Sequence, residues 1–161
     1  MNPSHIKTPD GIFTAFFSER GLVGLEFPRR SKSAKKPVPV QRDAPPHLKE
    51  WQLLTQAALL KALAGQRPGK LPPLDLSAGT AFKQSVWALL QSIPPGHTLS
   101  YSEVARAIGR PKAVRAVGQA CGANPIPVLV PCHRVLAAHG GLGGFSGGLE
   151  WKIKLLGREK A

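Results

Sequence analysis

The chain has 161 residues, of which 42% are hydrophobic, enough to bury a core in one or two small domains. Its formal net charge of +13 favours a polyanionic partner such as nucleic acid, although a basic surface also serves solubility alone. Two cysteines and five scattered histidines exclude a disulfide framework and predict no metal site, and no apolar run is long enough to span a membrane. Because residues 1–11 also lack the apolar core of a secretory signal, we expect free thiols in a reducing, cytoplasmic compartment.

The N-terminal part begins with two apolar, aromatic-rich runs, residues 12–17 and 22–27, separated by a short polar loop. This pattern predicts a β-hairpin. A proline-rich stretch, residues 28–46, follows, and its basic cluster at 29–36 fits either a phosphate contact or a solvated loop. Apolar residues at helical spacing then predict an amphipathic helix over residues 47–64.

A proline- and glycine-rich join precedes three predicted helices. Thr80 is the expected N-cap of the first, residues 81–92. The second, residues 101–108, and the third, residues 112–121, are separated only by the tight turn 109–111, which is the helix-turn-helix pattern. A glycine-rich loop and a last helix over 149–158 complete the chain.

The third of these helices is unusual for a reader of the DNA major groove, because most of its side chains are short. Small side chains permit the close backbone approach that a narrow minor groove demands. They equally suit simple packing against the neighbouring helix, and both interpretations stay open. The long polar side chains of this stretch are Lys112, Arg115 and Gln119.

Cys132 and His133 are adjacent and follow the apolar run 126–130, so we expect a short extended segment that places a thiol in a half-buried pocket. A thiol is a weak nucleophile at neutral pH, whereas its thiolate is a strong one, and a neighbouring imidazole can take the proton. A buried cysteine is more often inert packing, so this pair alone does not establish chemistry.

An ordered set of short motifs between residues 79 and 159 resembles the O6-alkylguanine-DNA alkyltransferase family, also called methylated-DNA–protein-cysteine methyltransferases. The matching positions are 79–82, 86–87, 93–94, 100–101, 115–118, 124–125, 131–135, 144–148, Lys152, 155–156 and Glu159. Residues 1–78 resemble the family only loosely. Many members carry tyrosine where this chain has Phe145, so the pocket is expected to lose one hydroxyl.

The resemblance implies an α+β fold: a small N-terminal domain (1–78) with an antiparallel, ribonuclease-H-like sheet, and a C-terminal helical domain (79–161) with a winged-helix-like helix-turn-helix. It implies repair of O6-alkylguanine, and also of O4-alkylthymine, in double-stranded DNA bound through the minor groove. The alkyl group moves irreversibly from a flipped-out base to Cys132, without a cofactor. Members act as monomers, and cooperative binding on DNA stays open, as does nucleoid association in a bacterium.

The resemblance also implies a role for each site residue. Cys132 accepts the alkyl group, His133 takes the thiol proton through a bridging water, and Glu159 orients the imidazole. Tyr101 donates to the leaving guanine, and Asn124 holds the turn before the active-site segment. The expected base pocket is Tyr101, Val135, Phe145, Ser146 and Gly147. The expected DNA-binding residues are Ser100, Lys112, Ala113, Arg115, Ala116 and Gln119, with Arg115 replacing the flipped nucleotide.

Other functions fit parts of the pattern. A non-catalytic protein that only binds alkylated DNA would need no acceptor thiol, and Cys132 argues against it. A helix-turn-helix transcription factor predicts sequence-specific binding and an unmodified Cys132. A cysteine hydrolase predicts multiple turnovers, whereas alkyl transfer predicts one event per molecule.

Overall fold

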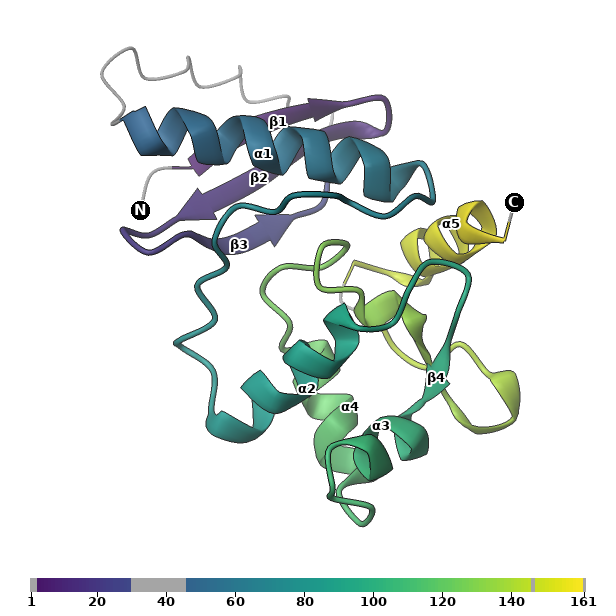
Figure 1. Ribbon diagram of the computed structural model, residues 1–161. Helices are drawn as coiled ribbons and strands as arrows, with labels where there is room; N and C mark the ends of the chain where they lie inside the picture. The colour runs from purple at the N-terminus through teal and green to yellow at the C-terminus, as the bar shows by residue number, and fades with distance from the viewer. Residues whose placement is uncertain (1–2, 30–45, 146, 161) are drawn as a thin grey trace.

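A computed structural model describes residues 3–29, 46–145 and 147–160 (Figure 1). Strands β1 (Pro3–Thr8), β2 (Gly11–Phe17) and β3 (Leu22–Glu26) form an antiparallel sheet in the order β1-β2-β3. The β2–β3 hairpin confirms the sequence prediction. Strand β1 was not predicted, because its one buried residue, Ile6, stands among polar side chains and gives no clear alternation.

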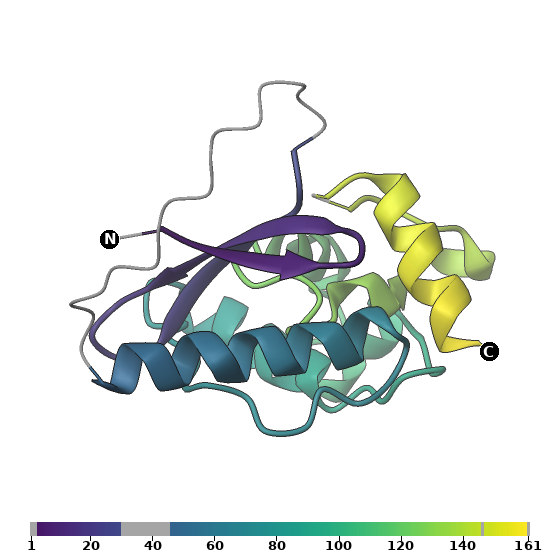
Figure 2. The same ribbon diagram turned by 90° about the horizontal axis from the view of Figure 1, so that it is seen from above.

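Helix α1 (Pro46–Leu63) runs along this sheet, as Figure 2 shows. It buries Ala58, Leu59, Ala62 and Leu63, while Trp51 stacks on Phe17 of β2 with ring centroids 6.4 Å apart. The predicted helix, 47–64, is confirmed to within a residue at each end. The predicted basic cluster at 29–36 lies outside the described residues, except for Arg29, whose guanidinium lies 3.6 Å from the Glu26 carboxylate.

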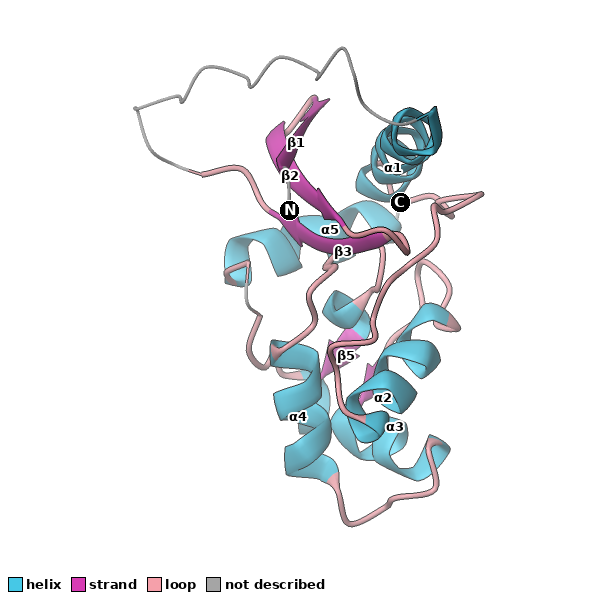
Figure 3. Ribbon diagram, turned by 90° about the vertical axis from the view of Figure 1, so that its left-hand side faces the viewer, coloured by secondary structure: helices cyan, strands magenta, loops and turns pink. Residues whose placement is uncertain are grey.

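The outer edge of β3 joins the sheet to the rest of the molecule. Leu22 exchanges backbone hydrogen bonds with the segment at Pro73 and Asp75, each 2.8 Å long. Further along the strand, the Leu25 amide donates to the Pro125 carbonyl at 2.9 Å. Figure 3 shows the sheet and α1 at one end of the molecule and helices α2, α3 and α4 at the other. The edge of β3 therefore contacts the segment that leads into the candidate site.

Helix α2 (Ala81–Gln91) begins as predicted, with the Thr80 hydroxyl accepting a hydrogen bond from the Lys83 amide. After β4 (Leu99–Ser100), helix α3 (Tyr101–Ala107) is capped in the same way by Ser100. Helix α4 (Val114–Gly122) begins two residues later than predicted. Lys112 and Ala113 therefore belong to the turn, because the Ala113 amide still bonds to the Arg110 carbonyl and closes that turn first.

The structure of the segment that carries Cys132 differs from the prediction. Residues Cys132–Arg134 form a short 3-10 helix, η1, and not an extended segment. The Arg134 amide donates to the Pro131 carbonyl at 3.1 Å, which curls the chain directly after the proline. Strand β5 (Val135–Leu136) then pairs in parallel with β4. A 3-10 turn, η2 (Ala138–Gly140), and helix α5 (Leu149–Glu159) follow.

Buried side chains of the sheet, of α1 and of the C-terminal helices join in one hydrophobic core. No helix among the described residues is long and apolar enough to cross a membrane.

Candidate active site

Cys132 lies at the start of η1 with only 4% of its surface exposed, so the thiol is buried and not half-buried as expected. The thiol is hydrogen-bonded to the side chain of Asn124, and its own amide donates to the Val130 carbonyl at 2.8 Å. Val128, in the apolar run before it, has a φ of 74°, which is rare and costly for a β-branched residue. The chain is therefore bent under strain where it delivers the thiol.

Asn124 braces this bend from within. Its Nδ2 donates to the Val130 carbonyl at 2.7 Å, and its Oδ1 accepts from the Ile126 amide at 2.9 Å. The side chain is buried, so both bonds are shielded from competing water. These two bonds hold the turn before η1, the position expected for Asn124, and its contact with Cys132 is additional.

His133 and Glu159 meet in the interior, because helix α5 folds back over η1. The His133 Nε2 and the Glu159 Oε1 are 2.7 Å apart. Arg134 contacts the same carboxylate through Nε, at 3.1 Å from both oxygens, and through Nη2 at 2.8 Å. Its Nη1 donates to the Ile93 carbonyl at 2.6 Å, so a buried guanidinium balances the buried carboxylate.

The charges of this group fix the tautomer of His133. Burial acts to raise the pKa of Glu159, but hydrogen bonds from His133 and Arg134 outweigh it and hold the pKa at about 2. Burial lowers the pKa of His133, so the imidazole is neutral at neutral pH. Because an ionised carboxylate can only accept, the Nε2 of His133 carries the proton. Its Nδ1 therefore bears the free lone pair, and it is buried without a hydrogen-bond partner among the described residues.

Lys152 is a second buried cation. The residue has no exposed surface, and its Nζ donates to the Val135 carbonyl at 2.8 Å and to the Gly144 carbonyl at 3.2 Å. Burial raises the pKa of the Cys132 thiol, while the Asn124 hydrogen bond and the positive charge of Lys152 oppose that rise. The thiol is therefore protonated at rest, and its proton must be removed before the sulfur can act as a nucleophile. We call Cys132, His133, Arg134, Lys152 and Glu159 the buried cluster.

Tyr101 links helix α3 to the glycine-rich loop. A backbone hydrogen bond joins its hydroxyl to Gly144, and burial raises the pKa of the phenol, which stays protonated. Gly143 has a φ of 67°, and a Cβ at this position would lie 2.8 Å from the Tyr101 hydroxyl. A glycine is thus required both for the backbone conformation and for the space.

The loop of the expected base pocket rests on an aromatic group from the sheet side. Phe27 packs edge-on against Phe145 with ring centroids 5.7 Å apart, and it also contacts Trp151 at 4.9 Å. A Cβ on Gly147 would lie 2.4 Å from the Phe27 ring, so this glycine accommodates that ring. Val135 is fully buried. Ser146, the remaining member of the expected pocket, lies outside the described residues.

The expected DNA-binding residues lie elsewhere: all except Ser100 are on or just before α4. Lys112, Arg115 and Gln119 are exposed, and their side chains make no hydrogen bond or ion pair with another described residue. We call these three the α4 face. Ala113 and Ala116 are half-buried beside them, and Ser100 is occupied as the cap of α3.

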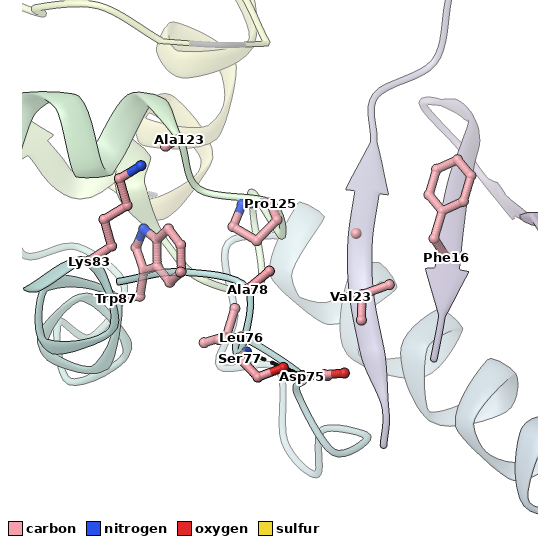
Figure 4. A pocket seen from close by; sticks show the side chains of 12 residues that line it. Phe16, Val23, Asp75, Leu76, Ser77, Ala78, Lys83, Trp87, Ala123 and Pro125 are labelled. Atoms are coloured by element: carbon pink, nitrogen blue, oxygen red, sulfur yellow. Dashed lines mark hydrogen bonds between the residues drawn. The ribbon is translucent and has the colours of Figure 1, made fainter. Parts of the chain in front are cut away.

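Two hollows lie between the sheet and the segment around Asn124 and Pro125. Figure 4 shows a largely apolar one of about 450 Å³, where Phe16 and Val23 of the sheet face Trp87 of α2 and Pro125. A smaller one of about 330 Å³ is lined by Asn124, Gly147 and Phe27, among others. The second hollow thus opens directly onto the brace of the thiol and the glycine-rich loop.

Sequence reasoning missed four residues that shape this site. Arg134 and Lys152 stood inside matching motifs without a role, although a charged side chain among apolar neighbours is a recognisable signal. Gly143 and Phe27 stood in the predicted glycine-rich loop and hairpin without a role, because their importance depends on contacts that only the fold creates. Among the described residues, no group of histidine, cysteine or acidic side chains could hold a metal ion.

Known proteins resemble this chain along most of its length. The family described as "6-O-methylguanine DNA methyltransferase, DNA binding domain" matches residues 81–161. A methylated-DNA–protein-cysteine methyltransferase of Methanosarcina barkeri is 37% identical over 158 residues, which cover 96% of this chain and 94% of that protein. The chain belongs to the 6-O-methylguanine DNA methyltransferase family.

A solved structure supports the same assignment. The OGT of Mycobacterium tuberculosis, determined in complex with DNA, is 38% identical with a TM-score of 0.78, covering 98% of this chain and 92% of that one. This likeness confirms the mixed fold of helices and a small antiparallel sheet. The bifunctional transcriptional activator and DNA repair enzyme Ada of Escherichia coli is 53% identical over 87 residues, 54% of this chain. The chain spans about a quarter to about half of the length of several curated relatives that it matches.

Proposed function

We propose that this protein repairs DNA by moving an alkyl group from O6-alkylguanine to Cys132 in a single, irreversible step. The observation that carries the proposal is the buried cluster: an acceptor thiol next to a neutral imidazole whose second nitrogen is held by an ionised carboxylate. The family and the methylated-DNA–protein-cysteine methyltransferase of M. barkeri support the same reaction. O4-alkylthymine is a second expected substrate.

The proposed chemistry balances without a cofactor. The Cys132 proton passes through a bridging water to His133 Nδ1, and the imidazolium that forms is stabilised by the Glu159 carboxylate. The sulfur attacks the alkyl carbon in line, the new S–C bond forms as the C–O6 bond breaks, and the guanine leaves with the bonding electrons. The Tyr101 hydroxyl donates a hydrogen bond to the base, which disperses the negative charge that develops there.

The thiol lies in the interior, so the damaged base must leave the duplex to reach it. We propose that α4 enters the minor groove, where Ala113 and Ala116 permit close approach and Arg115 replaces the extruded base. Flipping costs a few kcal/mol, and least where the base is mispaired. The M. tuberculosis OGT solved with DNA supports the choice of partner.

Finer features follow the same family resemblance. We expect a monomer that works in a reducing compartment such as the cytoplasm, where the acceptor thiol stays free. We also expect a ribonuclease-H-like unit over residues 1–78 and a winged-helix-like unit over residues 79–161. Cooperative binding along DNA is compatible with this arrangement.

One experiment separates repair from its rivals. The protein is incubated with a duplex that contains a single O6-methylguanine, and intact mass and peptide mapping follow. We expect one added methyl group on Cys132, stoichiometric with the lost lesion, and none on Cys121 or in Cys132→Ala. A protein that only binds alkylated DNA would retain the lesion and gain no mass. Several lesions lost per molecule, or transfer by Cys132→Ala, would refute the proposal.

A further inference from the structure

The last turn of α5 carries two adjacent side chains that point in different directions. Glu159 turns inward to His133, whereas the Arg158 guanidinium reaches the N-terminal part of the molecule. Its Nη1 and Nη2 contact the two carboxylate oxygens of Asp10 at 2.8 and 2.7 Å, and Nη1 also donates to the Leu63 carbonyl at 2.9 Å. One helix turn thus joins the buried cluster to the sheet and to α1.

Asp10 is itself well placed for this contact. It lies in the turn between β1 and β2, where the Thr8 hydroxyl donates to the Gly11 carbonyl at 2.8 Å and accepts from the Asp10 amide at 3.2 Å. The Asp10 side chain is only 14% exposed. The hydrogen bonds from Arg158 lower the pKa of Asp10, so the pair is ionised at neutral pH. A bidentate pair of this kind is directional and restricts the guanidinium to one orientation.

Two turns that contain glycine pack against the backbone at the C-terminal end of α5. Gly65, directly after α1, has a φ of 79°, and a Cβ there would lie 2.4 Å from the Arg158 carbonyl. A Cβ on Gly96 would lie 3.4 Å from the Glu159 carbonyl. The end of a helix normally frays, because its last carbonyls have no partner within the helix. Here two glycine turns and one ion pair surround that end.

We propose that Asp10, acting through Arg158, is a positioning residue that holds the Glu159 carboxylate against His133. The inference rests on the alkyl-transfer function proposed above. Through Asp10, the N-terminal sheet would influence the rate of alkyl transfer, although that sheet contributes no residue to the buried cluster. Asp10 and Arg158 are 148 positions apart, so no sequence spacing could have joined them.

The role predicts a change in the imidazole as well as in the rate. In Asp10→Asn, the distance from Glu159 to His133 becomes less well defined, and the proton on Nε2 is held less firmly. We expect the rate of methyl transfer to Cys132 at saturating DNA to fall roughly three- to tenfold, the size typical of coupled contacts. Nitrogen NMR of His133 without DNA should show a mixture of the two neutral tautomers, where the parent protein shows the Nε2–H form alone.

A matched control lies at the other end of strand β2. Ser18 donates to Asp75 at 2.6 Å and also joins the sheet to the rest of the chain, but it is not connected to α5. Ser18→Ala should lower stability without altering the His133 tautomer or the transfer rate. Arg158→Gln, which removes the other partner of the pair, should reproduce the tautomer mixture of Asp10→Asn.

A combination with Glu159→Gln distinguishes positioning from general stability. If Asp10 acts through Glu159, Asp10→Asn should reduce the rate no further in that background. Full additivity of the two losses, or an unchanged tautomer in both Asp10→Asn and Arg158→Gln, would overturn the inference. Because the NMR signal needs no substrate, it judges the inference even if Cys132 were never methylated.

Discussion

The buried cluster and the α4 face differ in how their side chains are held. In the cluster, the single carboxylate of Glu159 accepts hydrogen bonds from both His133 and Arg134. On the α4 face, the position of Arg115 follows only from the helix backbone, since no described side chain restrains it. The same protein thus contains one region whose polar atoms are nearly all satisfied and one whose polar atoms are free.

The difference fits the two tasks proposed above for these regions. Transfer of an alkyl group requires the sulfur, the base and the proton acceptor to be arranged before the substrate arrives, since small misplacements cost large factors in rate. Side chains that read or replace a nucleotide acquire their partners from the DNA itself. We therefore expect changes in the cluster to affect rate and stability together, and changes on the α4 face to affect mainly the use of duplex DNA.

The largest effect should come from Glu159→Gln. The amide still accepts from His133, but the buried charge of Arg134 loses its balance, and the imidazolium formed in the reaction loses its stabilisation. We expect transfer to slow by roughly a hundredfold, within the range of general-base effects, and stability to fall by about 3 kcal/mol. Urea unfolding and single-turnover kinetics measure the two losses. A large loss of rate without any loss of stability would show that the cluster is not one unit.

Lowering the pH should reduce the free energy of unfolding through the same buried groups, Glu159 and His133, without a mutation. The pKa of Glu159 is about 2 against an ordinary 4.5, so its contribution is complete above pH 4.5 and is lost as pH falls toward 2. The loss amounts to about 3 kcal/mol. Burial also lowers the pKa of His133 from 6.5, so the unfolded chain takes up that proton first and stability already declines below pH 6.5. Unfolding free energies that stay constant between pH 7 and pH 3 would contradict both assignments.

Lys152→Met should have an intermediate effect. Methionine fills a similar volume, but the carbonyls of Val135 and Gly144 lose their donor, at a cost of about 1–3 kcal/mol. The Cys132 thiol also loses the positive charge that opposes the rise of its pKa. Transfer should therefore slow at neutral pH and recover in part at higher pH. Identical pH profiles for the variant and the parent would exclude an electrostatic role.

Much of this molecule was predictable because its signals are local. Thr80 caps helix α2 where the sequence places it, and the β2–β3 hairpin follows from apolar runs on either side of a polar loop. Strand β1 was not predicted, because its polar sequence shows no strand pattern and its extended conformation depends on backbone pairing with β2. The start of α4 was predicted two residues too early, because the Ala113 amide donates its hydrogen bond to the Arg110 carbonyl in the preceding turn.

The candidate site was predictable only through its motif. Adjacency suggested Cys132 and His133, but the contact with Glu159 depends on α5 folding back over η1. The protonated state of the thiol could not be read from the sequence either, because it follows from the near-complete burial of Cys132 in the fold. The contacts of Phe27 and Asp10 with the site were harder still to predict. Each residue contacts a segment more than a hundred positions away in the sequence.

Arg115 offers the smallest and most specific test of the α4 face. If its guanidinium takes the place of the flipped base, Arg115→Ala should slow transfer from a paired duplex by roughly tenfold, because part of a flipping cost of a few kcal/mol is no longer offset. The deficit should shrink when O6-methylguanine is mispaired or single-stranded. Gln119→Ala, one turn further along the same face, should cause a smaller loss that is alike on all three substrates. If Arg115→Ala behaved as that control does, Arg115 would be a phosphate contact, and the free polar atoms of α4 would serve binding alone.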